Sequence, residues 1–575
     1  MRLAALLLLL TVVPQDAVER DRSPRDLALS PGGKWAVTAN ATAGSVSLVD
    51  LEKGVVATEV AVGRRPEGIA WAGARVVVAN HLADSITILD ADPPKLTVAA
   101  TVEVGDEPRG VAIAGDQAFV VLSGEDAVAV VDLVERKVTA RVAVGTEPWH
   151  ATLSPDGRRL VVGNTRSRDV SVIDTAKLAV ERTVRLNGRN VRRAAVSPDG
   201  ASAYVPFAGE LGFPTGKADI ENGWVIANRL GRVALDREEP RTAIALDARK
   251  DAMADLEAAA VSPDGQTIAL AAGGTHELIL LRLPLPFAAR TRDHIDPKLH
   301  GDAKRFRRVP LGGRPVAVAF QPDGWRAVVA NYLSNSVQVV DVEKGAVEKT
   351  IALGGPAKPS LARAGEAVFY DGSRSLGHWF SCHSCHTDGH TNGGLFDTFG
   401  DREYGTKKKT PTLRNVANTG PWTWHGIEKD LRASVRKSME KTLQGPKATE
   451  ADLDAILAFL ATLEPASPRP PADAEAVKRG DALFHAKRCH TCHAPPLYTI
   501  DRLEDVGTGT KDDLFEGYNP PSLLGVGRRA PWLHDGRARS LEELLKKHHA
   551  PSKTREEKDF TDAELADVMA FLKSL

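Results

Sequence analysis

Residues 329–341 read Val-Ala-Asn-Tyr-Leu-Ser-Asn-Ser-Val-Gln-Val-Val-Asp, and this stretch recurs in altered form along the first part of the chain. It begins as an apolar strand, turns at Ser-Asn, and continues as a strand that ends in Asp. Residues 75–90 follow the same order. Short apolar or alternating runs bounded by turn residues are typical of antiparallel β-strands.

The repeat has a nearly constant length. Seven copies align, four on a strand-opening proline and three on a Ser-Pro-Asp-Gly-like turn, at Pro24, Pro66, Pro108 and Pro148 and at residues 197–200, 262–265 and 321–324. The first four starts lie 40 to 42 residues apart. Four short strands in each period of about 40 residues are the pattern of a propeller blade, which must stack on its neighbours to bury its faces. The sequence therefore predicts a seven-bladed β-propeller over residues 20–356.

Two copies carry extra sequence. The fifth is interrupted near residues 207–239 and the sixth near residues 283–308. Inserted segments map to loops, which often carry binding. Segments such as Val-Ala-Asn-His at residues 78–81 resemble the repeats of the YVTN family of bacterial propellers. That resemblance implies the β-propeller fold. It does not identify the propeller's ligand, because propellers host many functions.

Three side chains follow the strand-opening prolines of the third and fourth copies, namely Arg109, Trp149 and His150. They either line the mouth of a channel or are packing and solvated residues of the blades. We interpret them as the latter, because function has to be argued from a site rather than from a fold.

After Pro356 the pattern of apolar residues changes from that of strands to that of helices. Residues 451–463 have an apolar face at i, i+3 and i+4, and the chain ends in a similar helix over residues 562–575. A Pro-rich polar stretch separates the two halves. The sequence predicts two tandem α-helical domains, which we name cytochrome domain 1 (residues 358–464) and cytochrome domain 2 (residues 474–575), joined by a linker (residues 465–473).

All four cysteines of the chain lie in two Cys-x-x-Cys-His units, Cys382-His-Ser-Cys385-His386 and Cys489-His-Thr-Cys492-His493. Two thiols one helical turn apart can form thioethers to the vinyl groups of a haem, and the adjacent His then becomes the proximal iron ligand. The sequence predicts two covalent haem c groups.

A zinc site or a redox dithiol is the alternative for these cysteines. The pairs are widely separated in the sequence, lie in separate helical domains, and are each followed by a histidine, which favours haem. The histidines inside the motifs, His383 and His490, are interpreted as solvated spacers.

The N-terminus predicts export. Residues 3–13 form an apolar run too short to cross a bilayer but suited to the core of a signal peptide, here placed at residues 1–17, with an N-terminal strand or buried helix as the alternative. Haem attachment outside the cytoplasm agrees with a periplasmic or otherwise exported protein. The formal charge of −1 gives no indication of nucleic-acid binding, and no other segment could span a membrane.

The helical half resembles the bacterial di-haem cytochrome c peroxidases and the related methylamine-utilisation di-haem enzymes. The resemblance rests on the Pro-Trp-Leu-His-Asp-Gly run at residues 531–536 and on the parallel Pro-Trp-Thr-Trp-His-Gly run at residues 421–426. Both runs stand at the same distance after a Pro-x-Leu segment, so the two domains look duplicated. The resemblance implies that electrons pass between two haems, with peroxide reduction or substrate oxidation at the first.

The family also implies where the sixth iron ligands lie. In the second domain the position is His548, followed by His549, where the family has Met or Tyr; solvated residues of a basic helix are the alternative. In the first domain the equivalent positions are Ser438 and Met439. The first haem therefore has either Met439 or an open sixth position, since His390 stands too close to His386 to serve.

Other residues follow from the same resemblance. Trp424 matches the inter-haem tryptophan of the family, with a buried structural indole as the alternative, and His425 is a candidate acid/base group. Tyr404 is a further polar candidate near the first haem. The family's inter-domain calcium is doubtful here, since Gly420 and Arg529 stand where a threonine is expected.

Two functions remain open from the sequence. The first is a peroxidase-like oxidoreductase that receives electrons from a small redox protein or another donor. The second is an electron-transfer cytochrome without catalysis of its own, in which the propeller is a docking scaffold.

Overall fold

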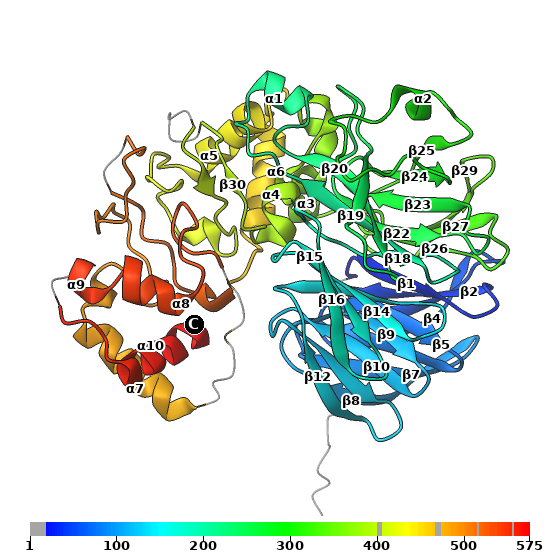
Figure 1. Cartoon of the computed structure of the whole chain (residues 1–575), viewed down its shortest axis with the longest axis horizontal. Helices are drawn as coiled ribbons and strands as arrows, with labels where there is room; N and C mark the ends of the chain where they lie inside the picture. The colour runs from blue at the N-terminus through cyan, green and yellow to red at the C-terminus, as the bar shows by residue number, and fades with distance from the viewer. Residues whose placement is uncertain are drawn as a thin grey trace, which may run out of the picture.

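The computed structural model describes residues 19–399, 405–465, 468, 473–514, 517–528, 530–554 and 557–575. The predicted signal peptide and most of the predicted linker lie outside the described residues. Seven antiparallel sheets come first, and a helical half lies beside them (Figure 1). In the described part of the chain no helix is both long and apolar enough to cross a membrane.

The seven-bladed propeller is confirmed. Its strands, blade by blade, are β1 (Pro24–Leu29), β2 (Trp35–Asn40), β3 (Ser45–Asp50) and β4 (Val55–Ala61); β5 (Pro66–Ala72), β6 (Arg75–Asn80), β7 (Ser85–Asp92) and β8 (Lys95–Glu103); β9 (Pro108–Ala114), β10 (Gln117–Leu122), β11 (Ala127–Asp132) and β12 (Lys137–Ala143); β13 (Pro148–Leu153), β14 (Arg159–Asn164), β15 (Asp169–Asp174) and β16 (Ala179–Arg185); β17 (Gly188–Arg189), β18 (Ala195–Val196), β19 (Ser202–Gly209), β20 (Ala227–Ala234) and β21 (Thr242–Ala245); β22 (Leu256–Val261), β23 (Thr267–Ala272), β24 (Glu277–Arg282) and β25 (Phe306–Pro310); and β26 (Pro315–Phe320), β27 (Arg326–Asn331), β28 (Ser336–Asp341) and β29 (Ala346–Ala352).

Burial explains the sequence pattern of the blades. The middle strands β2 and β3 are buried almost throughout, because the apolar side chains on both of their faces pack between neighbouring blades. The outer strands β4, β12, β16 and β29 alternate between exposed and covered residues. The inner strands pack side by side around the central axis, and β26 packs on β1 to close the ring.

The fifth and sixth blades depart from the plain meander. The chain between β19 and β20 carries α1 (Lys217–Glu221), and the chain between β24 and β25 carries α2 (Pro297–His300). The first of these segments, residues 210–226, is called the blade-five insertion below. It leans toward the helical half (Figure 1).

The helical half holds two similar helix pairs. Its helices are α3 (Leu361–Tyr370), α4 (Cys382–Cys385), α5 (Leu431–Lys437) and α6 (Glu450–Leu460), then α7 (Ala474–Ala486), α8 (Leu541–Glu543), α9 (Pro551–Thr554) and α10 (Asp562–Ser574), with a small hairpin of β30 (Leu395–Phe396) and β31 (Lys408–Lys409). In both domains the first long helix crosses the last at a glycine. A Cβ on Gly365 of α3 would stand 1.8 Å from the backbone oxygen of Ala455, and one on Gly480 of α7 would stand 2.1 Å from that of Asp567. Only glycine allows these close crossings.

Candidate functional site: two cysteine motifs and the surfaces that hold them

The first cysteine motif forms the short helix α4, which Ser381 caps. His386 follows it, and its Nδ1 lies 3.0 Å from the carbonyl oxygen of Pro411. Because a carbonyl only accepts, Nδ1 carries the proton and Nε2 holds the free lone pair. Burial lowers the pKa of His386 to about 4, so the ring is neutral near pH 7. This is the state in which an imidazole binds iron.

The second motif has the same arrangement around its histidine. The one-turn helix η6 (Cys489–Thr491) follows α7, and Nδ1 of His493 lies 3.2 Å from the carbonyl oxygen of Tyr498. The proton is again on Nδ1, and Nε2 can bind a metal.

The cysteines of the first motif lie among apolar side chains, partly supplied by the propeller. Cys382 and Cys385 pack against a cluster drawn from the blade-five insertion, from nearby propeller residues and from domain 1, which consists of Ile220, Val225, Ile226, Ala227, Ala252, Trp379, Phe380, Phe396 and Leu443. Burial raises the pKa of the Cys382 thiol to about 12, which disfavours the thiolate that zinc or a redox dithiol requires. Apolar walls around a thiol pair and a neutral histidine fit a covalently attached haem.

No gathering of three or more His, Cys, Asp and Glu side chains suited to a metal ion occurs among the described residues. Arg529 and Tyr404, two residues singled out in the sequence, lie outside the described residues.

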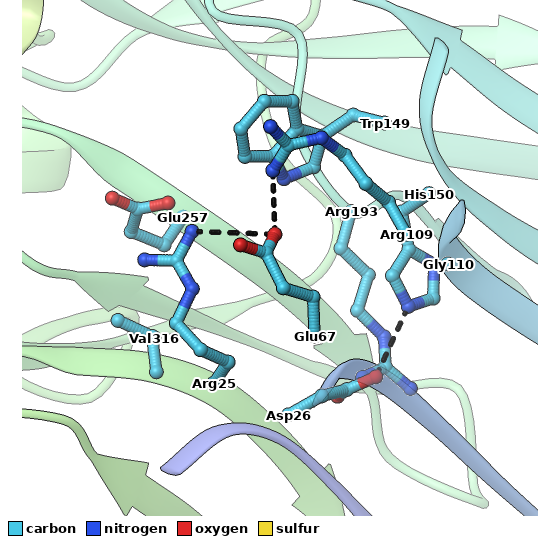
Figure 2. Close-up of a pocket in the computed structure, with 10 residues that line it drawn as sticks. All are labelled: Arg25, Asp26, Glu67, Arg109, Gly110, Trp149, His150, Arg193, Glu257 and Val316. Atoms are coloured by element: carbon cyan, nitrogen blue, oxygen red, sulfur yellow. Dashed lines mark hydrogen bonds and ion pairs between the residues drawn. The ribbon is translucent and has the colours of Figure 1, made fainter. Parts of the chain in front are cut away.

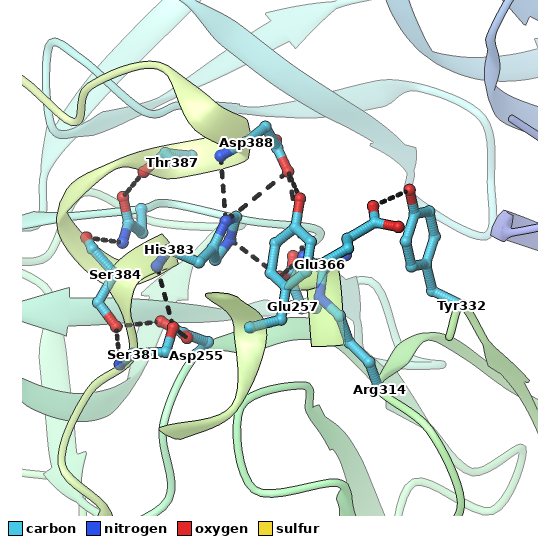
Figure 3. A network of polar contacts seen from close by, with 12 residues as sticks. Asp255, Glu257, Arg314, Tyr332, Glu366, Ser381, His383, Ser384, Thr387 and Asp388 are labelled. Carbon is cyan, nitrogen blue, oxygen red and sulfur yellow. Dashed lines mark hydrogen bonds and ion pairs between the residues drawn. The ribbon is translucent and has the colours of Figure 1, made fainter. Parts of the chain in front are cut away.

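His383 is not a solvated spacer, contrary to our interpretation of the sequence. Its side chain is 1% exposed and belongs to a buried polar network between domain 1 and the propeller (Figure 3). The backbone N–H of Asp388 donates to its Nδ1 at 3.0 Å, and its Nε2 lies 3.2 Å from Oε1 of Glu257 on β22. The propeller therefore holds the inner histidine of the first motif.

Two arginines of the propeller complete the charge balance around Glu257. Arg314 lies 2.8 Å from Oε1, and Arg192 lies 3.6 Å from Oε2. Burial by itself would raise the pKa of Glu257, but the two guanidinium groups outweigh it and hold that pKa well below its usual range. Arg314 also stacks on Tyr370 of α3, with its guanidinium carbon 3.5 Å from the ring centroid.

A second set of contacts holds the cap of α4. The hydroxyls of Ser381 and Ser384 each donate to one oxygen of Asp255 at 2.5 Å. Asn190 of the fifth blade donates to the carbonyl oxygen of Ser384 at 2.9 Å and accepts from Thr387. The propeller thus contacts both the side chains and the backbone of the first motif.

The central channel of the propeller is filled with charged side chains. Arg109, Trp149 and His150 line this channel and pack on side chains of other blades, so the channel position and the packing role are both confirmed and a solvated position is not (Figure 2). Arg109 lies over the Trp149 ring at 3.8 Å and forms an ion pair with Glu67. The space left between these side chains is about 30 Å³, room for only a few water molecules.

The two cytochrome domains meet through aromatic residues. Trp424 of domain 1 packs edge-on against His534 of domain 2, with centroids 6.2 Å apart, and its indole N–H donates to the carbonyl oxygen of Lys409 at 2.7 Å. The internal duplication makes Trp424 and His534 equivalent positions, so each domain contributes the same loop to the contact.

His425 lies in the same contact and not at a solvent-filled face. It is 2% exposed and packs at a tilt on Tyr518, which in turn stacks on His534 with centroids 4.3 Å apart. The Tyr518 hydroxyl donates to Asp513 at 2.7 Å. Burial lowers the pKa of His534 to about 4, so this ring is neutral near pH 7.

The candidate sixth ligands lie on two π-helical turns. Met439 is on η5 (Ser438–Thr442), is 6% exposed, and belongs to the core cluster against which Cys382 packs. His548 ends η8 (Leu544–His548), and its Nε2 faces Glu543 at 3.9 Å. The ring that lies near His493 is that of His549, with centroids 6.4 Å apart.

Several residues of the first site could not be recognised from the sequence. Asp255, Glu257 and Arg192 each lie in strands or loops of the propeller more than 100 residues before the motif. Arg314, a further residue of this network, does have a weak signal in the sequence, because it immediately precedes a strand-opening proline, as Arg65 does in the second blade.

The two halves match different known proteins. Residues 108–205 match the YNCE-like β-propeller family, and residues 359–468 match the di-haem cytochrome c peroxidase family. The methylamine utilization protein MauG of Methylorubrum extorquens is 27% identical over 279 residues, covering 38% of this chain and 79% of that protein. MauG of Methylophilus methylotrophus is 25% identical over 284 residues, covering 39% and 84%.

Hydrazine synthase is similar to a further part of the chain. The beta subunit from Kuenenia stuttgartiensis is 29% identical over 208 residues, which cover 34% of this chain and 53% of that subunit. A solved chain of hydrazine synthase from the same organism superposes on 57% of this chain and 98% of its own length, with 26% identity and a TM-score of 0.50.

Proposed function

This chain joins a seven-bladed YNCE-like β-propeller to a helical half of the di-haem cytochrome c peroxidase family, and we propose that it is an exported oxidoreductase that passes electrons between two covalent haems. His386 and His493 would hold the irons, and the two cysteine pairs would hold the porphyrins. A bound haem supplies one-electron chemistry and, where a coordination position is open, a site for peroxide.

The observation that carries this proposal is the aromatic contact between the cytochrome domains. Trp424, His534 and Tyr518 pack ring against ring between the loops that follow the two cysteine motifs. A dense, rigid contact of this kind supports electron exchange between the domains, and Trp424 is our candidate relay. His425 supports the relay by packing on Tyr518.

The first haem is the proposed site of chemistry. Its cysteine pair is enclosed by the blade-five insertion, a feature that belongs to this propeller and not to a cytochrome domain. The overall reaction for peroxide takes two electrons and two protons to give two water molecules. The second motif is the proposed entry point for electrons, because His490 is only half-buried and a small redox protein can approach it.

The position of Met439 favours a second function. It is buried in the core of domain 1, at the position that corresponds to His549 by the internal duplication. If its sulfur holds the first iron, both haems are closed and the protein only transfers electrons.

Spectroscopy of the purified protein separates these functions. Optical and EPR spectra are recorded for the oxidised and half-reduced protein, with and without hydrogen peroxide. The proposal expects one high-spin haem in the half-reduced state and its reaction with peroxide. Two low-spin haems in every state, with no response to peroxide, would establish the electron-transfer function instead.

A further inference from the structure

The ring of His549 stands opposite the ring of His493. The two centroids are 6.4 Å apart and the ring planes make an angle of 72°. Imidazoles on opposite sides of one metal ion have centroids about 6.3 Å apart, because each metal–nitrogen bond is about 2.0 Å and each centroid lies about 1.15 Å beyond its nitrogen. The spacing of the two histidines therefore fits a metal atom between them.

The protonation of His493 agrees with this arrangement. Its Nδ1 donates to the carbonyl oxygen of Tyr498, so the nitrogen left for a metal is Nε2. The surroundings agree as well. Cys489 and Trp532 pack against the apolar cluster that contains Leu541 and Leu545, two residues of the segment that carries His549.

A π-helical turn explains why His549, and not His548, reaches this position. The backbone N–H of His549 bonds to the carbonyl oxygen of Leu544, five residues earlier, at 2.7 Å. A π turn holds one residue more than an α turn, so the following side chain moves round by one position. The position that the family resemblance implied, His548, therefore lies one residue before the side chain whose ring is near His493.

His548 points elsewhere. Its side chain is 26% exposed, and its Nε2 faces the carboxylate of Glu543 on the preceding turn at 3.9 Å. His548 is therefore a matched control for His549, because it is a neighbouring histidine on the same turn.

We propose that His549 is the sixth ligand of the second haem, which makes this centre a bis-imidazole haem closed to small molecules. This inference rests on the proposed function only in requiring a haem on Cys489 and Cys492. A His/His centre has a lower reduction potential than the His/Met centre of related proteins. It suits transfer of electrons toward the first haem and excludes peroxide from the second.

The first test needs no variant. Ferric EPR and near-infrared magnetic circular dichroism of the full-length protein with both haems are expected to show a bis-imidazole low-spin haem for one of the two irons. The near-perpendicular ring planes predict the strongly anisotropic type of low-spin signal. Absence of any bis-imidazole signal would overturn the proposal.

The second test compares His549→Ala with His548→Ala, each checked for two attached haems by its pyridine haemochrome. His549→Ala is expected to turn the second haem high-spin and let it bind carbon monoxide when reduced, and added imidazole is expected to restore the low-spin spectrum. His548→Ala is expected to match the wild type.

A wild-type spectrum in His549→Ala, or loss of the signal in His548→Ala, would overturn the assignment and leave the ring contact as ordinary edge-to-face packing. If His549→Ala loses its haem, His549→Met replaces it, with an expected rise in the potential of the second haem; an unchanged potential would count against the proposal. None of these measurements uses peroxide. The proposed peroxide reaction can therefore be disproved without affecting the assignment of His549 as a ligand.

Discussion

The two Cys-x-x-Cys-His motifs share one sequence pattern and lie in unlike surroundings. His383 of the first is 1% exposed and contacts Glu257 of the propeller, whereas His490, at the same place in the second, is half-buried and stacks on His485 of its own domain with centroids 4.8 Å apart. The first motif is thus part of an interface, and the second is a self-contained cytochrome element. The propeller is better understood as a wall of the first site than as a separate binding module.

Removal of the acid at the centre of this interface should have the largest effect. Glu257→Ala leaves the buried Arg192 without its nearest carboxylate and leaves Arg314 with only Asp388, 4.0 Å away, which costs about 3–5 kcal/mol in the free energy of unfolding. Asp481→Ala, which removes the exposed partner of His485 near the second motif, should cost less than about 0.5 kcal/mol. Urea titrations followed by tryptophan fluorescence measure both. Similar small losses in the two variants would show that the charge network does not hold the propeller to domain 1.

The inner histidines provide a smaller and more direct comparison. His383→Ala removes the partner of the Asp388 N–H and of Glu257, and an unsatisfied buried group costs about 1–3 kcal/mol. His490→Ala should change stability by no more than about 0.5 kcal/mol. Differential scanning calorimetry of both variants tests this order, and an equal shift of melting temperature would remove the distinction between the motifs.

Lowering the pH should reduce the free energy of unfolding, in part through the carboxylates that surround the first motif. Glu257 and Asp388 have folded pKa values held below their usual ranges, so the unfolded chain binds more protons as the pH falls. Their stabilisation is complete above the ordinary glutamate pKa of 4.5 and decreases below it, at up to about 1.4 kcal/mol per pH unit for each group. Urea midpoints at pH 6, 4.5 and 3.5 should fall over both intervals, over the first because the buried neutral His386 and His534 have pKa values lowered to about 4. The contribution of Glu257 is isolated by Glu257→Gln: its difference from wild type should be constant between pH 6 and 4.5 and should shrink between pH 4.5 and 3.5. A constant difference down to pH 3.5 would exclude Glu257 as a source of the acid-induced loss.

Local patterns were sufficient for much of the molecule. The strand-opening prolines Pro24, Pro66, Pro108 and Pro148 are the first residues of β1, β5, β9 and β13, because a blade repeats its turn chemistry with each copy. The tautomer of His386 was not open to prediction, since it depends on a carbonyl group 25 residues away. The error at His383 has the same origin, because the position that follows a motif cysteine is exposed unless another domain covers it.

The sequence by itself determined the seven blades, the duplicated helical domains and the two Cys-x-x-Cys-His motifs, since periodicity, turn residues and motif spacing are properties of neighbours in the chain. Only the tertiary structure decided that Glu257, Arg314 and Asp255 hold the first motif, and that a π turn brings His549 to His493. Contacts between residues far apart in the chain and a one-residue change of helical register leave no periodic pattern in the sequence, because they depend on which surfaces meet after folding.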